Sequence, residues 1–184
     1  MANLDIMFAG FGGQGILFGG KIIAYSGLLD GRQLSWMPSY GPEMRGGTAN
    51  CSVCLSDEAI GSPIVTKPDA LLAMNIPSYN RFANAVKPGG IIIVDSTIAD
   101  VSCERDDVAF YRVPATRLAE ANGLASLANV ILVGKLLRLT AFSSLETLDE
   151  AIEKSVSAKH LDLLEFNKQA LRIGYEFVEQ QEQV

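Results

Sequence analysis

Residues 10–15, Gly-Phe-Gly-Gly-Gln-Gly, place four glycines between an apolar segment and a helix-forming one near the N-terminus. Residues 4–9 are mostly apolar and predict a buried strand, while residues 16–29 predict a helix. Glycine permits a sharp turn and a close approach of backbone to a ligand, and the start of a helix offers free N–H groups. The run therefore predicts a strand–turn–helix unit suited to cradling a phosphate. The turn residues that would contact such a ligand are Gly10, Gly12, Gly13, Gln14 and Gly15.

Length and composition predict a single domain that covers residues 1–184. A chain of 184 residues that is 48% hydrophobic and 20% charged is long enough for one packed core and short for two domains. The formal charge of −6 argues against nucleic acid as a partner. No signal peptide is recognised, and the most apolar later stretch, residues 124–137, is too short to span a bilayer. We therefore expect a cytoplasmic protein with no membrane partner.

The remaining sequence alternates between strand and helix signals. Strands are expected near residues 4–10, 33–37, 49–55, 69–74, 91–94 and 108–113, and helices near 14–29, 78–86, 124–139, 143–155 and 161–178. Ser143 and Glu146 fit a capping box at the start of one helix, and the last helix is expected to bury an apolar stripe that ends at Val178. The alternation predicts an α/β fold: a single Rossmann-like domain whose mostly parallel sheet is flanked by helices on both faces.

Gly10, Gly12 and Gly15 also match the G-x-G-x-x-G fingerprint of dinucleotide-binding domains. That fold normally places an acidic residue at the end of its second strand, about 20 residues after the glycines, to hold the adenosine ribose. Asp30 lies at this distance but precedes the expected strand at 33–37, which itself ends without an acid. A free-standing NAD(P)-dependent reductase therefore stays an alternative, as does a purely packing role for the glycines.

A second loop, residues 38–48, follows the second expected strand and is rich in Pro, Gly and charge. In a parallel sheet it should open at the same carboxyl edge as the glycine turn. Arg45 has a planar guanidinium group that can bind a phosphate or a carboxylate through two parallel hydrogen bonds. An equally open alternative is a surface turn in which Glu43 and Arg45 pair with each other or meet solvent. The residues of interest in this loop are Ser39, Tyr40, Glu43, Arg45 and Gly46.

Three cysteines and one histidine give little support for metal or redox chemistry in this chain. Cys51 and Cys54 form a C-x-x-C, but they lie in the expected strand at 49–55, where residues three apart point to opposite faces. A redox C-x-x-C normally sits at a helix N-terminus instead. We therefore predict that Cys51 and Cys54 are ordinary strand cysteines. The three cysteines of the chain are too few for an iron–sulfur cluster held by four thiolates, and we predict no metal site and no catalytic residue.

Together, residues 10–15 and residues 39–49, Ser-Tyr-Gly-Pro-Glu-Met-Arg-Gly-Gly-Thr-Ala, resemble the gamma subunit of 2-oxoacid:ferredoxin (acceptor) oxidoreductases. The resemblance covers essentially the whole chain, and the nearest type is the 2-oxoglutarate one. Four further residues fit it, namely Asp95, Asn129, Gly134 and Asn167.

The resemblance implies a Rossmann-like subunit that assembles with alpha and beta subunits and often with a small ferredoxin-like one. Such an assembly decarboxylates a 2-oxoacid on thiamine diphosphate and magnesium, passes electrons through iron–sulfur clusters and forms an acyl-CoA. It implies that this chain alone binds none of these groups and is inactive. The turn at residues 10–15 and Arg45 then become candidates for contact with CoA. Ser39, Tyr40, Glu43 and Gly46 become candidates for the interface or the substrate-side loop.

Overall fold

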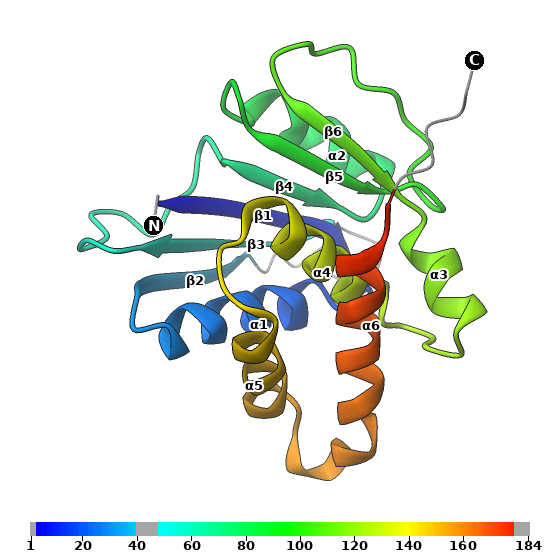
Figure 1. Ribbon diagram of the computed structural model, residues 1–184. Helices are drawn as coiled ribbons and strands as arrows, with labels where there is room; N and C mark the ends of the chain where they lie inside the picture. The colour runs from blue at the N-terminus through cyan, green and yellow to red at the C-terminus, as the bar shows by residue number, and fades with distance from the viewer. Residues whose placement is uncertain (1–2, 40–47, 179–184) are drawn as a thin grey trace.

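The computed structural model describes residues 3–39 and 48–178, and within them six strands form one sheet in the order β2-β3-β1-β4-β5-β6 (Figure 1). The strands are β1 (Leu4–Phe11), β2 (Gln33–Ser39), β3 (Thr48–Ser56), β4 (Ala70–Ala73), β5 (Ile91–Asp95) and β6 (Ala109–Val113). β1, β4, β5 and β6 pair in parallel, whereas β3 runs antiparallel to both β1 and β2. The prediction of a mostly parallel sheet is confirmed, with β3 as the reversed strand.

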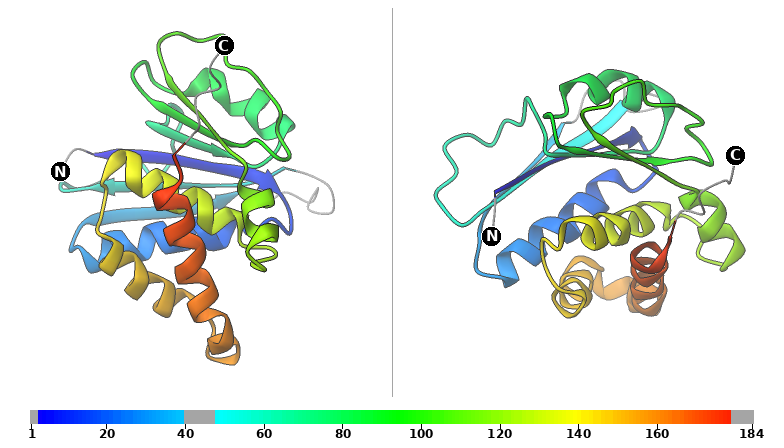
Figure 2. Two further views of the ribbon diagram at one scale, coloured as in Figure 1. Left: turned by 45° about the vertical axis from the view of Figure 1, so that its right-hand side comes forward. Right: turned by 45° about the horizontal axis from the view of Figure 1, so that its top comes forward.

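Helices cover both faces of the sheet, as predicted, but unequally (Figure 2). The helices are α1 (Ile16–Leu29), α2 (Ile76–Phe82), α3 (Ala115–Ala121), α4 (Ala128–Thr140), α5 (Leu145–Ser155) and α6 (Leu164–Glu176), with 3-10 segments η1 (Ala83–Ala85) and η2 (Ala158–Leu163). On one face, α2 and η1 pack against the sheet. On the other, α1 and α4 pack against it, and α5 and α6 form an outer layer on those two helices.

The alternation of side chains along the strands divides the apolar core between these two faces. Ile6 and Phe8 of β1 belong to the larger core beneath α1 and α4, whereas Met7 joins Leu71 in the smaller core beneath α2. Residues 128–137 of α4 are buried all round the helix. This follows from its position, because the sheet covers one side of α4 and α6 covers another.

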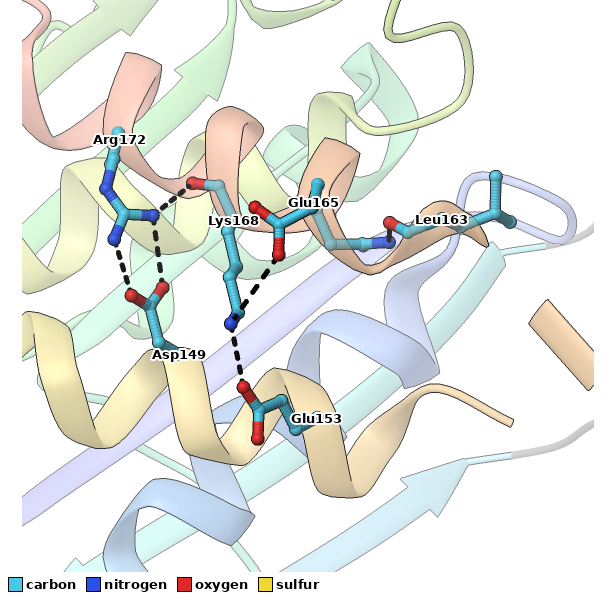
Figure 3. Close-up of polar contacts among 7 residues, drawn as sticks. Asp149, Glu153, Leu163, Glu165, Lys168 and Arg172 are labelled. Carbon is cyan, nitrogen blue, oxygen red and sulfur yellow. Dashed lines mark hydrogen bonds and ion pairs between the residues drawn. The ribbon is translucent and has the colours of Figure 1, made fainter. Parts of the chain in front are cut away.

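Exposed ion pairs join the two outer helices, α5 and α6 (Figure 3). Arg172 binds Asp149 through both nitrogens of its fork, and Lys168 lies 2.7 Å from Glu153 and 3.8 Å from Glu165. Pairs at this level of exposure contribute little free energy each, since water screens them. The pairs to Asp149 and Glu153 link α6 to α5, whereas Glu165 lies on α6 itself.

Three local expectations from the sequence are wrong. Ser144, not Ser143, caps α5 by accepting a hydrogen bond from the Thr147 N–H. α4 begins at residue 128 rather than 124, because Ser126 adopts a φ of 71°, which no α-helix contains. Val178 lies beyond the end of α6 and is 79% exposed, so it is not part of the buried stripe.

Helix α3 was not expected from the sequence at all. Its first turn is fixed by a tertiary contact, since the buried Asp95 carboxylate accepts hydrogen bonds from the backbone N–H and the hydroxyl of Thr116. A seven-residue helix has little stability of its own. Its formation therefore depends on this contact and on packing against α4.

Candidate functional site at the carboxyl edge of the sheet

The sheet has a topological switch point between β1 and β4. These two strands are parallel neighbours, and the helices that follow them, α1 and α2, lie on opposite faces. Open α/β sheets bind ligands in the crevice outside the carboxyl ends of the strands at such a point. The glycine turn after β1 lies there.

Residues 11–14 form a tight turn whose tip is bare backbone. The Gln14 N–H donates to the Phe11 carbonyl at 3.2 Å, and Gly13 takes a φ of 97°, as the third position of a type II turn requires. Gly12 and Gly13 are exposed, and a Cβ built on Gly13 would meet no atom within 4 Å. The peptide at the tip is therefore open to close approach by another molecule.

The outer two glycines of the motif face protein atoms instead. A Cβ on Gly10 would lie 2.5 Å from Ile16 Cδ1 and 2.7 Å from Gln14 Oε1. Gly15 has a φ of 73°, and a Cβ there would lie 2.5 Å from Asn129 Nδ2. Close packing between the strand and the helices therefore explains why residues 10 and 15 are glycines. The same motif thus has two glycines that serve packing and an exposed tip at Gly12 and Gly13.

The N-terminus of α1 points its unpaired N–H groups toward this edge. Gly15 is the N-cap, and among the described residues no side chain caps the helix and no acid occurs in its first turn. These N–H groups keep the partial positive charge of a helix start. Turn and helix end together present donors suited to an anionic group.

Gln14 occupies the switch point itself. Its Oε1 accepts hydrogen bonds from the Phe11 N–H at 2.6 Å and from Asn75 Nδ2 at 3.3 Å. Its Nε2 donates to the Met74 carbonyl at 3.2 Å. The side chain therefore links the glycine turn to the residues that follow β4, across the crevice where a Rossmann domain seats a pyrophosphate.

The second predicted loop lies mostly outside the described residues, and so do Tyr40, Glu43, Arg45 and Gly46. Its described end, Ser39, is the exposed last residue of β2. Ser39 pairs with Asn50 of β3, and Asn50 pairs with Ala9 of β1, so all three lie toward the carboxyl edge of β1. β3 lies between β2 and β1, which places Ser39 about 10 Å from β1, two strand spacings away. Thr48, at the other end of the loop, pairs directly with Phe11 beside the glycine turn.

Asp30 cannot serve a nucleotide at the glycine turn. It is the C-cap of α1, and 14 helical residues put it about 20 Å from the turn. Its carboxylate accepts hydrogen bonds from the Ser143 hydroxyl at 2.6 Å and the Thr147 hydroxyl at 3.2 Å, tying α1 to α5. Since β2 also ends without an acid, the geometry disfavours the dinucleotide alternative.

Cys51 and Cys54 point to opposite faces of β3, as predicted. Cys51 faces α1, where its thiol donates to the Ile16 carbonyl at 3.6 Å, and burial raises its pKa to about 12. Cys54 pairs with Ser35 and Asp5 on the flanking strands, and burial raises its pKa as well. Neither thiol has the low pKa of a reactive cysteine.

One polar group near this edge carried no signal in the sequence beyond the family resemblance. Asp95 ends β5, is fully buried, and also accepts the Thr97 N–H at 3.1 Å in addition to its bonds to Thr116. A buried carboxylate with this many donors fixes the chain after β5. In the sequence Asp95 only closes an apolar run and is followed by Ser96 and Thr97, a pattern that did not single it out.

Within residues 3–39 and 48–178, no group of three or more His, Cys, Asp or Glu side chains is placed to hold a metal ion. In the same part of the chain, no helix is both long enough and apolar enough to cross a membrane.

Comparison with known proteins gives matches over almost the whole chain. The family model described as pyruvate ferredoxin/flavodoxin oxidoreductase matches residues 5–177. Ketoisovalerate oxidoreductase subunit VorA of Methanothermobacter thermautotrophicus is 41% identical over 95% of this chain, which spans only 36% of that relative's length. 2-Oxoglutarate synthase subunit KorC of Methanocaldococcus jannaschii is 37% identical over 94% of this chain and 92% of its own.

Solved structures of two relatives share the fold. The gamma subunit of a keto/oxoacid ferredoxin oxidoreductase from Geobacter sulfurreducens matches with a TM-score of 0.81 and 28% identity, over 96% of both chains. A 2-oxoglutarate:ferredoxin oxidoreductase from Magnetococcus marinus matches with a TM-score of 0.83 and 26% identity, over 95% of this chain and 30% of its own. These matches confirm the family predicted from residues 10–15 and 39–49. The chain belongs to the pyruvate ferredoxin/flavodoxin oxidoreductase family.

Proposed function

We propose that this chain is the gamma subunit of a multisubunit 2-oxoacid:ferredoxin oxidoreductase. The whole enzyme would break the bond between the carboxylate and keto carbons of a 2-oxoacid, release CO₂ and join the acyl group to the sulfur of CoA. The electron pair left behind would pass to oxidised ferredoxin, one electron at a time, with release of a proton. Its partners would be alpha and beta subunits and a small ferredoxin-like subunit, in the cytoplasm, where CoA and ferredoxin meet.

The observation that carries this proposal is the match to KorC, which agrees in extent as well as in sequence. Relatives of the same region are named for different 2-oxoacids: ketoisovalerate, 2-oxoglutarate and, at 28% identity, pyruvate in the PorC subunit of Thermotoga maritima. One fold shared by enzymes for three acids supports a gamma subunit that leaves the choice of acid to its partners. The 2-oxoglutarate type is the one we propose here.

The side chains of this chain do not fit the redox cofactor of such a complex. A cluster needs about four cysteine thiolates, whereas the chain has three cysteines, and Cys51 and Cys54 lie on opposite faces of β3. We therefore assign iron–sulfur clusters, together with thiamine diphosphate and magnesium, to the partner subunits. The isolated chain would then have no activity.

The contribution of this chain would be made at the carboxyl edge. The bare tip at Gly12 and Gly13 and the uncapped start of α1 suit a phosphate of CoA or an acidic group on a partner. Arg45 would add a charged fork beside them. In this proposal Ser39, Tyr40, Glu43 and Gly46 belong to the interface or the substrate-side loop.

The test is reconstitution with candidate alpha and beta subunits against a panel of 2-oxoacids. We expect no CoA-dependent oxidation by the chain alone and full activity only when it joins the other subunits. Arg45→Ala should raise the Michaelis constant for CoA or weaken assembly without changing the fold. Gly13→Val should do more harm, because a β-branched residue strains at a φ of 97° and covers the bare tip.

Gly31→Val serves as the matched control, since Gly31 is also exposed, has a φ of 71°, and a Cβ there meets no atom within 4 Å. Turnover by the purified chain with an artificial acceptor would contradict the subunit role. Wild-type CoA kinetics and assembly in both Arg45→Ala and Gly13→Val would contradict the assignment of the two loops.

A further inference from the structure

The tip of the glycine turn is exposed and carries no side chain that could pack against the rest of the protein. Two successive glycines have the largest backbone freedom of any pair of residues, and Gly12 and Gly13 are both exposed. Fixing a residue's backbone in one conformation costs conformational entropy. A turn used for close contact would pay that cost on binding unless other groups had already ordered it.

Gln14 supplies that order through a carboxamide whose orientation is unambiguous. Its Oε1 faces two donors, the Phe11 N–H and Asn75 Nδ2, and its Nε2 faces the Met74 carbonyl. Reversing the amide would set donor against donor and acceptor against acceptor at all three contacts. The bond from Phe11 closes the turn from within, and the other two tie it to the chain after β4.

The partners of Gln14 are themselves fixed. Asn75 is 1% exposed, and its Oδ1 accepts the Ser78 N–H at 2.8 Å as the N-cap of α2. On the opposite face of the sheet, Asn129 of α4 donates through Nδ2 to the Gly15 carbonyl at 2.9 Å. The turn is therefore held between helices on both faces, with Gln14 and Asn129 as the two links.

Holding the turn from α4 leaves one buried polar atom of Asn129 without a hydrogen bond in the described part of the chain. Its Oδ1 is buried and finds no hydrogen-bond partner among the described residues. An apolar side chain would avoid that cost but could not hold the Gly15 carbonyl. The hydrogen bond to the Gly15 carbonyl is therefore the contact that an asparagine makes here and an apolar residue could not.

We infer that Gln14 is a positioning residue: it preforms the Gly12–Gly13 tip for the contact that the gamma subunit makes at the carboxyl edge, and Asn129 assists from α4. What the tip contacts rests on the proposed function, whereas the ordering of the tip does not. Gln14 touches neither CoA nor partner in this assignment and acts through the backbone of the turn.

The first experiment measures backbone ¹⁵N order parameters of the full 184-residue chain. In wild type we expect values of about 0.85 at Gly12 and Gly13, typical of rigid backbone. Gln14→Leu, which removes all three hydrogen bonds, should lower them below about 0.6. Gln14→Glu keeps the two hydrogen bonds that the side chain accepts and loses the one it donates to the Met74 carbonyl, so its order parameters should lie between those of wild type and Gln14→Leu. Gln169→Leu, the same change at an exposed site on α6, should leave the turn unchanged.

The second experiment measures kinetics in the reconstituted enzyme. Gln14→Leu should raise the Michaelis constant for CoA, or the dissociation constant of the subunit, about tenfold, equal to ~1.4 kcal/mol, with kcat nearly unchanged. Gln14→Glu adds a negative charge beside the donors that would hold a CoA phosphate, so it serves the order-parameter comparison and not the kinetic one. If Gln14→Leu does not fold, the order parameters of Gln14→Glu and of wild type are compared instead.

The two experiments separate the inference from the proposed function. A rigid tip in folded Gln14→Leu, or a rigid tip in Gln14→Glu where the leucine variant fails to fold, would overturn the positioning role. A tip that loses order while CoA kinetics and assembly stay at wild-type values would leave the positioning role standing and refute the contact assigned to the carboxyl edge.

Discussion

Cys51 and Cys54 are three residues apart in sequence yet lie in separate chemical environments. With a pKa of about 12, Cys51 is thiolate in only about one molecule in 10⁴ at pH 8. We expect iodoacetamide at pH 8 to modify the partly exposed Cys103 first and to leave Cys51 and Cys54 unmodified, as measured by peptide mass spectrometry. In urea all three should react. Recovery of a Cys51–Cys54 disulfide from the folded protein would contradict the strand geometry.

At the scale of elements, the contact of α4 with α6 depends on two glycines. A Cβ on Gly134 would overlap the Leu171 carbonyl, and a Cβ on Gly174 would overlap the Ile131 carbonyl. Both obstacles are backbone atoms, which cannot rotate away. Gly174→Ala should therefore force the helices apart and destabilise the fold by about 3 kcal/mol, at the upper end of the range for overpacking.

Thermal unfolding followed by circular dichroism measures this effect, and a loss of about 3 kcal/mol corresponds to a Tm lower by about 6–12 °C in a chain of this size. Gly61→Ala is the control, because a Cβ at Gly61 meets no atom within 4 Å. It should leave Tm unchanged or raise it slightly. Equal Tm values for Gly174→Ala and wild type would show that the two helices do not touch through their backbones.

The segment between β5 and β6 is held to η1 by one arginine. Arg105 donates through Nη1 to the carbonyls of Ala83 and Val86 at 2.8 and 2.9 Å, and its fork binds both oxygens of Asp107. The hydrogen bond from Arg105 lowers the pKa of Asp107 below its ordinary value. Asp107 therefore stabilises the fold above its unfolded-state pKa, and this contribution is lost as pH falls through the lower folded-state pKa.

Asp107→Asn should consequently lower Tm at pH 7 by about 1–2 °C, a small effect since water screens the pair. At pH values below the folded-state pKa of Asp107 the variant and wild type should melt together, because the carboxylate is then protonated in both states. Asp106→Asn, the same change at the neighbouring exposed acid, serves as the control for the substitution itself. A Tm difference between Asp107→Asn and wild type that persists to low pH would mean that the stabilisation does not come from the carboxylate charge.

At the scale of the whole molecule, the switch point decides which ligands the fold can take. Gln14 spans the crevice between β1 and β4, and Asp30 lies at the far end of α1. We therefore expect calorimetric titration with NAD(H) and NADP(H) to give no binding at micromolar concentrations. A dissociation constant of a few micromolar, about −8 kcal/mol, would revive the reductase alternative.

The sequence by itself determined the local units. The strand–turn–helix at residues 10–15 was predictable because its glycines and the periodicity around them act over short separations. The opposite faces of Cys51 and Cys54 followed from the two-residue period of a strand. The family was also evident from two motifs, and the family model now confirms it.

Only the tertiary structure decided how these units meet. The sequence of residues 48–56 does not predict that β3 runs antiparallel to its neighbours and lies between β1 and β2. Strand order depends on contacts between residues far apart in the sequence. The same reason explains why the sequence could not show that Gln14 links the glycine turn to the chain after β4. A side chain's partners depend on which distant residues the fold brings to it, whereas its own strand or helix depends mainly on its neighbours.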